Sequence, residues 1–145
     1  VSADILHQHW HARFGEAATF FPGAERVLDE LQRLDVRMGL VTNGGSLMQR
    51  AKVAALGLDR FMSTILISAE VGVEKPDAAI FHLALEKLRC EKSEVWFVGD
   101  HPEFDIQGAE EAGLRGYWVR TGTAVASGRT PARQLKILTD LLDHI

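Results

Sequence analysis

The sequence has very little cysteine, no long apolar run and no excess of basic residues. Its 145 residues include one cysteine, Cys90, which excludes an internal disulfide framework and indicates a reducing compartment, the cytoplasm. No apolar run approaches the roughly 20 residues that a membrane-spanning helix needs. The first residues do not have the pattern of a signal peptide. We therefore expect no contact with a membrane.

The charge balance argues against a nucleic-acid partner. Sixteen Lys and Arg residues face twenty Asp and Glu residues, which gives a formal net charge of −4. Phosphate backbones attract basic surfaces, and this chain has no basic cluster that would provide one. We expect a small-molecule substrate instead.

Strand-like and helix-like segments alternate along the chain. With 46% hydrophobic and 25% charged residues, the composition is that of one globular domain without repeats or a long linker. The hydrophobic pattern predicts strands at 36–41, 61–68, 95–98 and 116–119. It predicts helices at about 3–13, 24–34, 46–56, 77–89 and 105–112, and a last one from 131. Such alternation predicts an α/β fold with a parallel, Rossmann-like sheet and helices on both faces.

Polar residues follow several of the predicted strands. Right-handed crossovers place the carboxyl ends of parallel strands at one edge of the sheet, where open α/β folds bind ligands. Thr42 and Asn43 follow the first predicted strand, Lys75 comes after the second, and Asp100 follows the third. Different chemical groups therefore converge on one edge.

Two carboxylates, Asp100 and Asp105, follow the apolar strand 95–98 and the turn at Gly99. Carboxylates held close together repel each other unless a cation or a proton lies between them. Mg²⁺, bound through a few carboxylates and a substrate phosphate, resolves that repulsion. Taken alone, the segment is equally compatible with an ordinary loop in which Asp caps a helix.

The other two segments suit a phosphate group. Thr42 offers a hydroxyl, and the turn at Asn43, Gly44 and Gly45 offers backbone amides. Lys75 adds a positive charge. In isolation the first segment is more often a simple turn, and a lone lysine is usually solvated. Together with a cation site, they form the arrangement that phosphoryl transfer needs to stabilise charge.

These segments resemble the haloacid dehalogenase superfamily. Residues 40–44 (Leu-Val-Thr-Asn-Gly), 73–77 (Val-Glu-Lys-Pro-Asp) and 98–105 resemble its second, third and fourth motifs in order and spacing. The resemblance extends from Phe20 to about Val119, and residues 21–24 resemble the return from a helical cap domain into the core. It implies that residues 1–19 are the end of an α-helical cap and that residues 20–145 form the core.

The resemblance also implies roles for individual residues. Thr42, Asn43 and Gly44 would bind the phosphoryl group, and Lys75 would neutralise the nucleophile and the phosphate. Asp100 would ligate Mg²⁺, with Asp105 as a second ligand or as its support. The dehalogenase branch works without metal, so the two acids favour a phosphatase-type member. Phe104 stands where many members have asparagine.

The first motif of the superfamily is missing. No Asp-x-Asp occurs in the 145 residues, so the chain has neither the nucleophilic aspartate nor the central strand that carries it. We expect a sheet with a gap between the strands at 36–41 and 95–98, filled by a missing segment, by a second copy or by collapse of the flanking strands.

The leading interpretation is an incomplete Mg²⁺-dependent phosphatase of a small phosphorylated metabolite, inactive by itself. The alternative is a catalytically inactive module that binds phosphate and Mg²⁺. A generic nucleotide-binding domain fits less well, because no glycine-rich phosphate motif is present.

Overall fold

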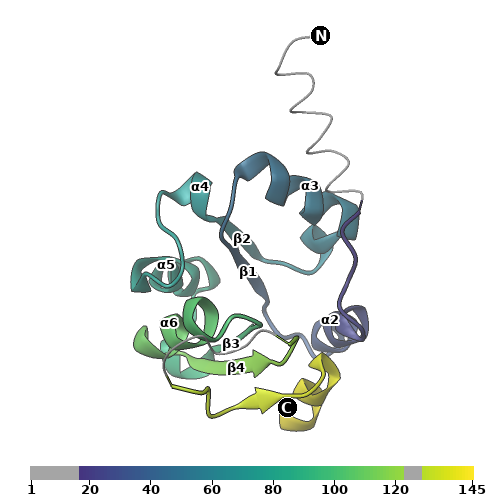
Figure 1. Cartoon of the computed structure of the whole chain (residues 1–145). Coiled ribbons are helices and arrows are strands. Elements are labelled where there is room, and N and C mark those ends of the chain that lie inside the picture. The colour runs from purple at the N-terminus through teal and green to yellow at the C-terminus, as the bar shows by residue number, and fades with distance from the viewer. Residues whose placement is uncertain (1–16, 123–128) are drawn as a thin grey trace.

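The computed structural model describes residues 17–122 and 129–145, in which helices and short strands alternate (Figure 1). Up to Leu88 the elements are α2 (Ala24–Arg33), β1 (Gly39–Thr42), α3 (Ser46–Leu56), the 3₁₀ helix η1 (Leu58–Arg60), β2 (Thr64–Ile67), α4 (Ser68–Val71) and α5 (Ala78–Leu88). From Lys92 onward they are η2 (Lys92–Glu94), β3 (Trp96–Gly99), the π-helix η3 (Pro102–Gln107), α6 (Gly108–Glu111), β4 (Arg115–Val119), β5 (Gln134–Leu135) and the 3₁₀ helix η4 (Leu138–His144). The predicted α/β organisation is confirmed.

The described strands form two parallel sheets. In one, β1 pairs with β2 so that Thr42 lies opposite Ile67. In the other, β3 pairs with β4, and β4 pairs with β5. Within the described residues, β1 and β3 share no hydrogen-bonded pairing (Figure 1). The break therefore falls where the sequence predicted a gap, between the strands at 36–41 and 95–98.

Helices cover both faces of the second sheet. Successive strand residues point to opposite faces, so Phe97 faces one way and Trp96 and Val98 face the other. Phe97 packs against a buried cluster from α5 and α6 that includes Phe81 and Ala109. Trp96 and Val98 pack against the opposite cluster, which α2 and η4 complete. Val41 of β1 also packs on the α5–α6 cluster, so this cluster joins the two sheets through apolar contacts.

Helix α5 has clear sequence signals at its start and along its buried face. Asp77 caps the helix, because its carboxylate accepts a hydrogen bond from the backbone N–H of Ala79 at 2.9 Å. The buried residues recur at helical spacing and include Ile80, Phe81 and Ala84. The preceding loop, which carries Lys75, is therefore anchored at the point where it enters a buried helix.

The predicted helix from residue 131 is wrong. Residues Gln134–Leu135 form β5, and η4 begins only at Leu138. Leu135, Leu138, Leu141 and Leu142 have helical spacing, but Leu135 lies opposite Val119 and is 1% exposed in the sheet cluster. Pairing with β4 and burial of Leu135 therefore override the local pattern.

Smaller differences concern the ends of elements. Helix α3 begins at Ser46 as predicted, with Gly45 in the cap position, and the Ser46 hydroxyl donates to Glu70. The helix expected from 105 begins earlier, as η3, and the strand expected at 61–68 is shorter, because β2 ends at Ile67 and α4 begins at Ser68. The helix expected at 3–13 lies outside the described residues. Among the helices described, none has the length and apolar character needed to cross a bilayer.

Candidate functional site

The carboxyl ends of β1 and β3 carry the predicted site residues. Thr42 is the last residue of β1, and Asp100 directly follows β3. Lys75 lies in the loop between α4 and α5, which follows β2. Parallel pairing brings the carboxyl ends of the strands together within each sheet. Direct contacts among Asn43, Lys75 and Asp105 then link the ends of the two sheets.

The side chain of Asn43 is bound to the main chain of Lys75. Its Nδ2 donates to the carbonyl oxygen of Lys75 at 2.9 Å, and its Oδ1 accepts from the backbone N–H of Lys75 at 2.8 Å. Both polar atoms of the amide are therefore engaged. The Asn43 side chain is therefore committed to the main chain of Lys75, whereas the Thr42 hydroxyl takes no part in these two hydrogen bonds.

Lys75 and Asp105 form a buried ion pair. Lys75 Nζ lies 2.6 Å from Asp105 Oδ1, and the two side chains are 12% and 8% exposed. The second carboxylate oxygen of Asp105 accepts from the backbone N–H of His101 at 3.0 Å. Removing either charge would leave the other buried without its partner, which costs more than loss of a surface pair.

Gly99 makes room for this carboxylate. A Cβ at Gly99 would lie 2.5 Å from the Cβ of Asp105. Asp105 therefore packs directly over the last residue of β3, and only glycine permits that approach. The Gly-Asp sequence at 99–100 thus serves two purposes: it accommodates Asp105 and delivers Asp100 to the edge.

Asp100 is half-buried and held through its main chain. The indole N–H of Trp118, from β4, donates to the carbonyl oxygen of Asp100 at 3.0 Å. The Thr121 hydroxyl lies 3.5 Å from Asp100 Oδ2. No Lys or Arg in the described part of the chain forms an ion pair with the Asp100 carboxylate.

The turn after β1 is fixed to α4. Gly44 has φ 135°, a backbone conformation that favours glycine. Its N–H donates to Ser68 Oγ at 2.9 Å, so the Gly44 amide expected to bind phosphate is engaged within the protein. The Thr42 hydroxyl has only a long contact, 3.4 Å, to the carbonyl oxygen of Asn43. Of these two groups, the Thr42 hydroxyl is therefore the one less engaged within the protein.

A second ion pair links α3 to α4. Arg50 binds Glu70 through Nε at 2.9 Å and through a terminal nitrogen at 2.5 Å, and the Ser46 hydroxyl also donates to Glu70. The hydrogen bonds from Arg50, and then the one from Ser46, lower the pKa of Glu70 from its usual 4.5 to about 2. Glu70 therefore remains charged throughout the neutral range.

The two acids differ in their suitability for a metal. Mg²⁺ in phosphate sites is held by one or two carboxylates, waters and the substrate phosphate. Asp100 presents such a carboxylate, whereas Asp105 is committed to Lys75 and to the His101 N–H. No group of three or more His, Cys, Asp or Glu side chains among the described residues could hold a metal. These contacts fit a cation held by Asp100 together with groups from outside the described residues.

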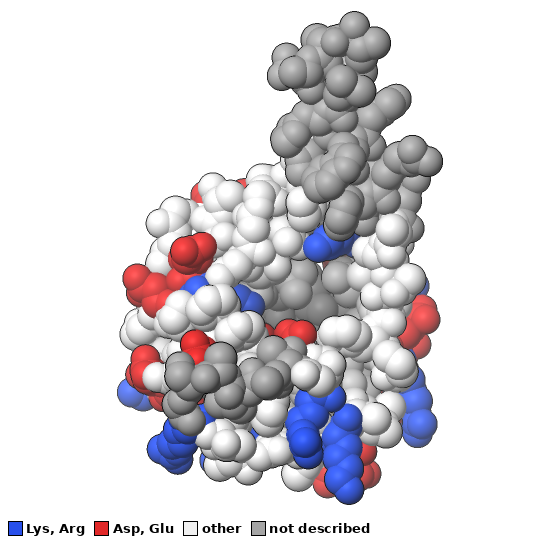
Figure 2. All heavy atoms as spheres, in the orientation of Figure 1, with Lys and Arg blue, Asp and Glu red and all other residues white. Residues whose placement is uncertain are grey.

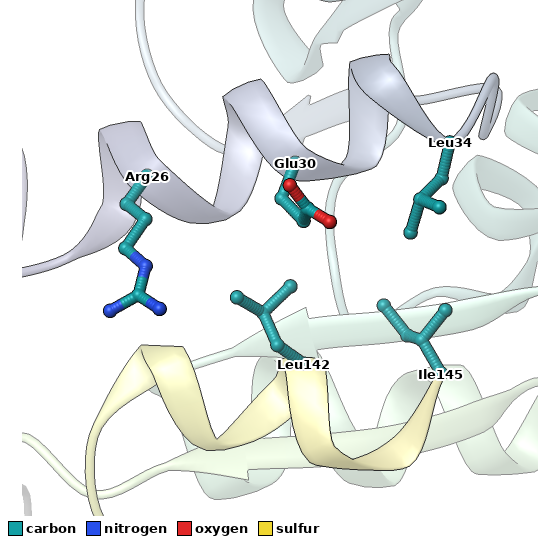
Figure 3. A pocket seen from close by; sticks show the side chains of 5 residues that line it. All are labelled: Arg26, Glu30, Leu34, Leu142 and Ile145. Carbon is teal, nitrogen blue, oxygen red and sulfur yellow. The ribbon is translucent and has the colours of Figure 1, made fainter.

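Two further features of the described part of the chain are its surface charge and a cavity. Figure 2 shows Lys and Arg side chains interspersed with Asp and Glu side chains on one face, without a large patch of one sign. A cavity of about 370 Å³ lies between α2 and η4. In Figure 3 its lining side chains from the two helices point toward one another: Arg26, Glu30, Leu34, Leu142 and Ile145. None of them is a predicted site residue.

Sequence reasoning missed three residues that contact the candidate site residues, namely Ser68, Trp118 and Thr121. Ser68 binds the turn at Gly44, and it follows β2 at the same edge, so the rule that located Thr42 could have located it. Trp118 holds the main chain of Asp100 from inside β4, and no local pattern signals such a contact. Thr121, beyond β4, also lay outside the predicted set.

Comparison with known proteins identifies the relatives of this chain. Residues 2–119 match the family model described as haloacid dehalogenase-like hydrolase. The phosphoserine phosphatase of Thermus thermophilus is 41% identical over 102 residues, which cover 70% of this chain and 41% of that protein. A glyceraldehyde 3-phosphate phosphatase of Pyrococcus abyssi is 37% identical over 122 residues, or 84% of this chain and 50% of that protein.

A solved structure supports the same fold. A putative hydrolase of this type from Bacillus subtilis, bound to magnesium, superposes with a TM-score of 0.83 at 24% identity, covering 99% of this chain and 63% of that one. The chain spans about half the length of the curated relatives it matches.

The Lys75–Asp105 pair predicts a large loss of stability on truncation. Asp105→Ala should lower the free energy of unfolding by about 3–5 kcal/mol, because it leaves a buried ammonium unpaired. The matched control is Glu25→Ala, which removes an exposed pair with Arg60 and should cost less than about 1 kcal/mol. Urea unfolding measures both. A loss for Asp105→Ala no larger than for the control would show that the pair is not buried in solution.

The Arg50–Glu70 pair predicts an acid-dependent change. Because the pKa of Glu70 is lowered, the pair stabilises the fold above pH 4.5 and this contribution is lost as the pH falls toward 2. Carboxyl NMR should give a Glu70 midpoint of about 2, and Arg50→Ala should return it toward 4.5. Arg33→Ala, which removes the partner of Glu30, should leave Glu70 unchanged. A midpoint near 4.5 in the unaltered protein would contradict the geometry.

Proposed function

The chain belongs to the haloacid dehalogenase-like hydrolase family, and from this premise we propose that it forms the core of a Mg²⁺-dependent phosphatase. The substrate class we propose is a small phosphorylated metabolite, because named relatives act on phosphoserine and on glyceraldehyde 3-phosphate. The observation that supports this most is the convergence of Thr42, Lys75 and Asp100 at one edge, with the lysine ammonium held by Asp105.

Each of these residues has a role in the proposal. The hydroxyl of Thr42 donates to a phosphoryl oxygen, and the Lys75 ammonium offsets the negative charge that develops there. Asp100 would hold Mg²⁺, which when bound stabilises charge on the phosphoryl oxygens. The resemblance implied that Asp105 is a second Mg²⁺ ligand or the support of Asp100. In this scheme Asp105 instead orients Lys75, because its two carboxylate oxygens are bound to Lys75 Nζ and to the His101 N–H.

The nucleophile must come from outside the described residues. No Asp-x-Asp occurs in the sequence, and the covalent route through an aspartyl phosphate needs such a residue. We propose that an added strand with this aspartate lies between β1 and β3, whose facing edges are unpaired within the described residues. A further segment or a second copy would supply it. In this scheme residues 1–19 end a cap domain, residues 20–145 form the core, and the chain by itself is inactive.

The second candidate function is a binding module that keeps the phosphate and Mg²⁺ groups without turnover. The absence of Asp-x-Asp is the observation that favours it. The single cysteine, Cys90, suits a reducing cytoplasm, where either protein would meet phosphorylated metabolites.

The intact mass and the N-terminal sequence of the polypeptide made by cells decide between the two candidates. We expect a product well above 16.0 kDa with Asp-x-Asp before Val1. That product should hydrolyse p-nitrophenyl phosphate with Mg²⁺ and lose the activity in EDTA. A product that begins at Val1 and shows no hydrolysis would contradict the phosphatase and favour the binding module.

The metal assignment predicts the effect of one substitution. Asp100→Asn should weaken Mg²⁺ binding by at least about tenfold, a cost usual even for residues that only support a ligand. The matched control is Asp59→Asn, which changes an exposed carboxylate in η1 and should leave the affinity unchanged. Calorimetry measures both. Equal Mg²⁺ affinities for Asp100→Asn and the unaltered protein would refute Asp100 as a ligand.

A further inference from the structure

Asn43 has been grouped with the phosphate-binding residues, but its side chain does something else. Nδ2 donates to the Lys75 carbonyl oxygen and Oδ1 accepts from the Lys75 N–H, at 2.9 and 2.8 Å. One planar amide thus binds both main-chain groups of a single residue. This pairing resembles the exchange of hydrogen bonds between two strand residues, and it fixes both the position and the plane of the Lys75 backbone.

Asn43 is itself held firmly. It directly follows β1, whose pairing with β2 runs to its last residue, Thr42. The side-chain amide of Gln49, from α3, donates to the Asn43 carbonyl oxygen at 3.2 Å, and the next residue, Gly44, is bound to Ser68. The amide of Asn43 therefore transfers the position of the β1–β2 sheet to the Lys75 loop.

Lys75 is consequently fixed at both ends. Asn43 holds its main chain, and Asp105 holds Nζ at 2.6 Å, with the ammonium 5.7 Å from the centre of the Phe97 ring. A lysine side chain has many rotamers, so an ammonium is placed accurately only when backbone and head group are both restrained. Asp105 is anchored to the β3 side of the site and Asn43 to the β1 side.

We propose that Asn43 is a positioning residue for Lys75, acting through the two hydrogen bonds to its main chain rather than by binding phosphate. The consequence for phosphate binding rests on the proposed function; the positioning itself does not. Asparagine is required because it carries a donor and an acceptor in one plane. Aspartate cannot donate to the Lys75 carbonyl oxygen, and leucine, of similar size, can form neither bond.

Site-resolved lysine labelling tests the positioning directly. Lysines of the unaltered protein and of Asn43→Leu are acetylated with an N-hydroxysuccinimide ester, and the rate at each site is followed by mass spectrometry. Lys75 should react about tenfold faster in Asn43→Leu, the factor expected for loss of ordinary hydrogen bonds. The exposed Lys87 and Lys92 are internal references and should keep their rates.

The matched control is Gln49→Ala, which removes a hydrogen bond to the same asparagine but leaves both contacts to Lys75. Its Lys75 rate should stay within about twofold of the unaltered protein, since no contact to Lys75 is lost. An unchanged Lys75 rate in Asn43→Leu would overturn the proposal. So would an equal increase at Lys75, Lys87 and Lys92, which would indicate general loosening of the fold.

A double-mutant cycle separates positioning from direct phosphate binding. The affinity for inorganic phosphate in the presence of Mg²⁺ is measured for Asn43→Leu, Lys75→Ala and the double variant. If Asn43 acts through Lys75, Asn43→Leu weakens binding in the unaltered background but has no further effect once Lys75 is alanine. Additive losses would mean that Asn43 contacts phosphate itself and would overturn the proposal. Failure of the unaltered protein to bind phosphate would contradict the proposed function alone, because the labelling still decides the positioning.

Discussion

The ion pair between Lys75 and Asp105 is the contact on which the rest of the site depends. It joins the loop that carries Lys75, between α4 and α5, to η3, which follows β3 in the other sheet. Burial makes the pairing obligatory, because an ammonium or a carboxylate that loses its partner here cannot be solvated freely. The pair also requires glycine at position 99, at the end of β3, because any side chain there would displace Asp105.

The same pair explains how several charged side chains lie near one another at the candidate site. Asp105 offsets the charge of Lys75, so the carboxylate of Asp100 stays available for a cation. Asn43 and Trp118 add no charge and act on main-chain groups, Asn43 on Lys75 and Trp118 on Asp100. In the proposed scheme the charged groups would reach the substrate while neutral groups set their positions, an arrangement that suits preorganised stabilisation of a phosphoryl group.

Much of this arrangement could be predicted from the sequence, and the reasons for the rest are physical. Thr42 and Asp100 lie at the ends of β1 and β3, as the sequence predicted, because the end of an apolar strand is visible in the sequence. The contact between Lys75 and Asp105 could not be derived, because the two residues lie 30 positions apart and their contact depends on how the Lys75 loop packs against η3. The helix predicted at Leu135 was wrong for a related reason: the leucine spacing is helical, but pairing with β4 decides the structure of this segment.

A crystal structure with Mg²⁺ and tungstate, an inert mimic of phosphate, would test the central claim most directly. The account predicts the anion within hydrogen-bonding distance of the Thr42 hydroxyl and Lys75 Nζ, with Mg²⁺ on the Asp100 carboxylate and Asn43 still bound to the main chain of Lys75. An anion bound elsewhere, for example beside Arg26 in the cavity between α2 and η4, with the edge empty, would contradict it.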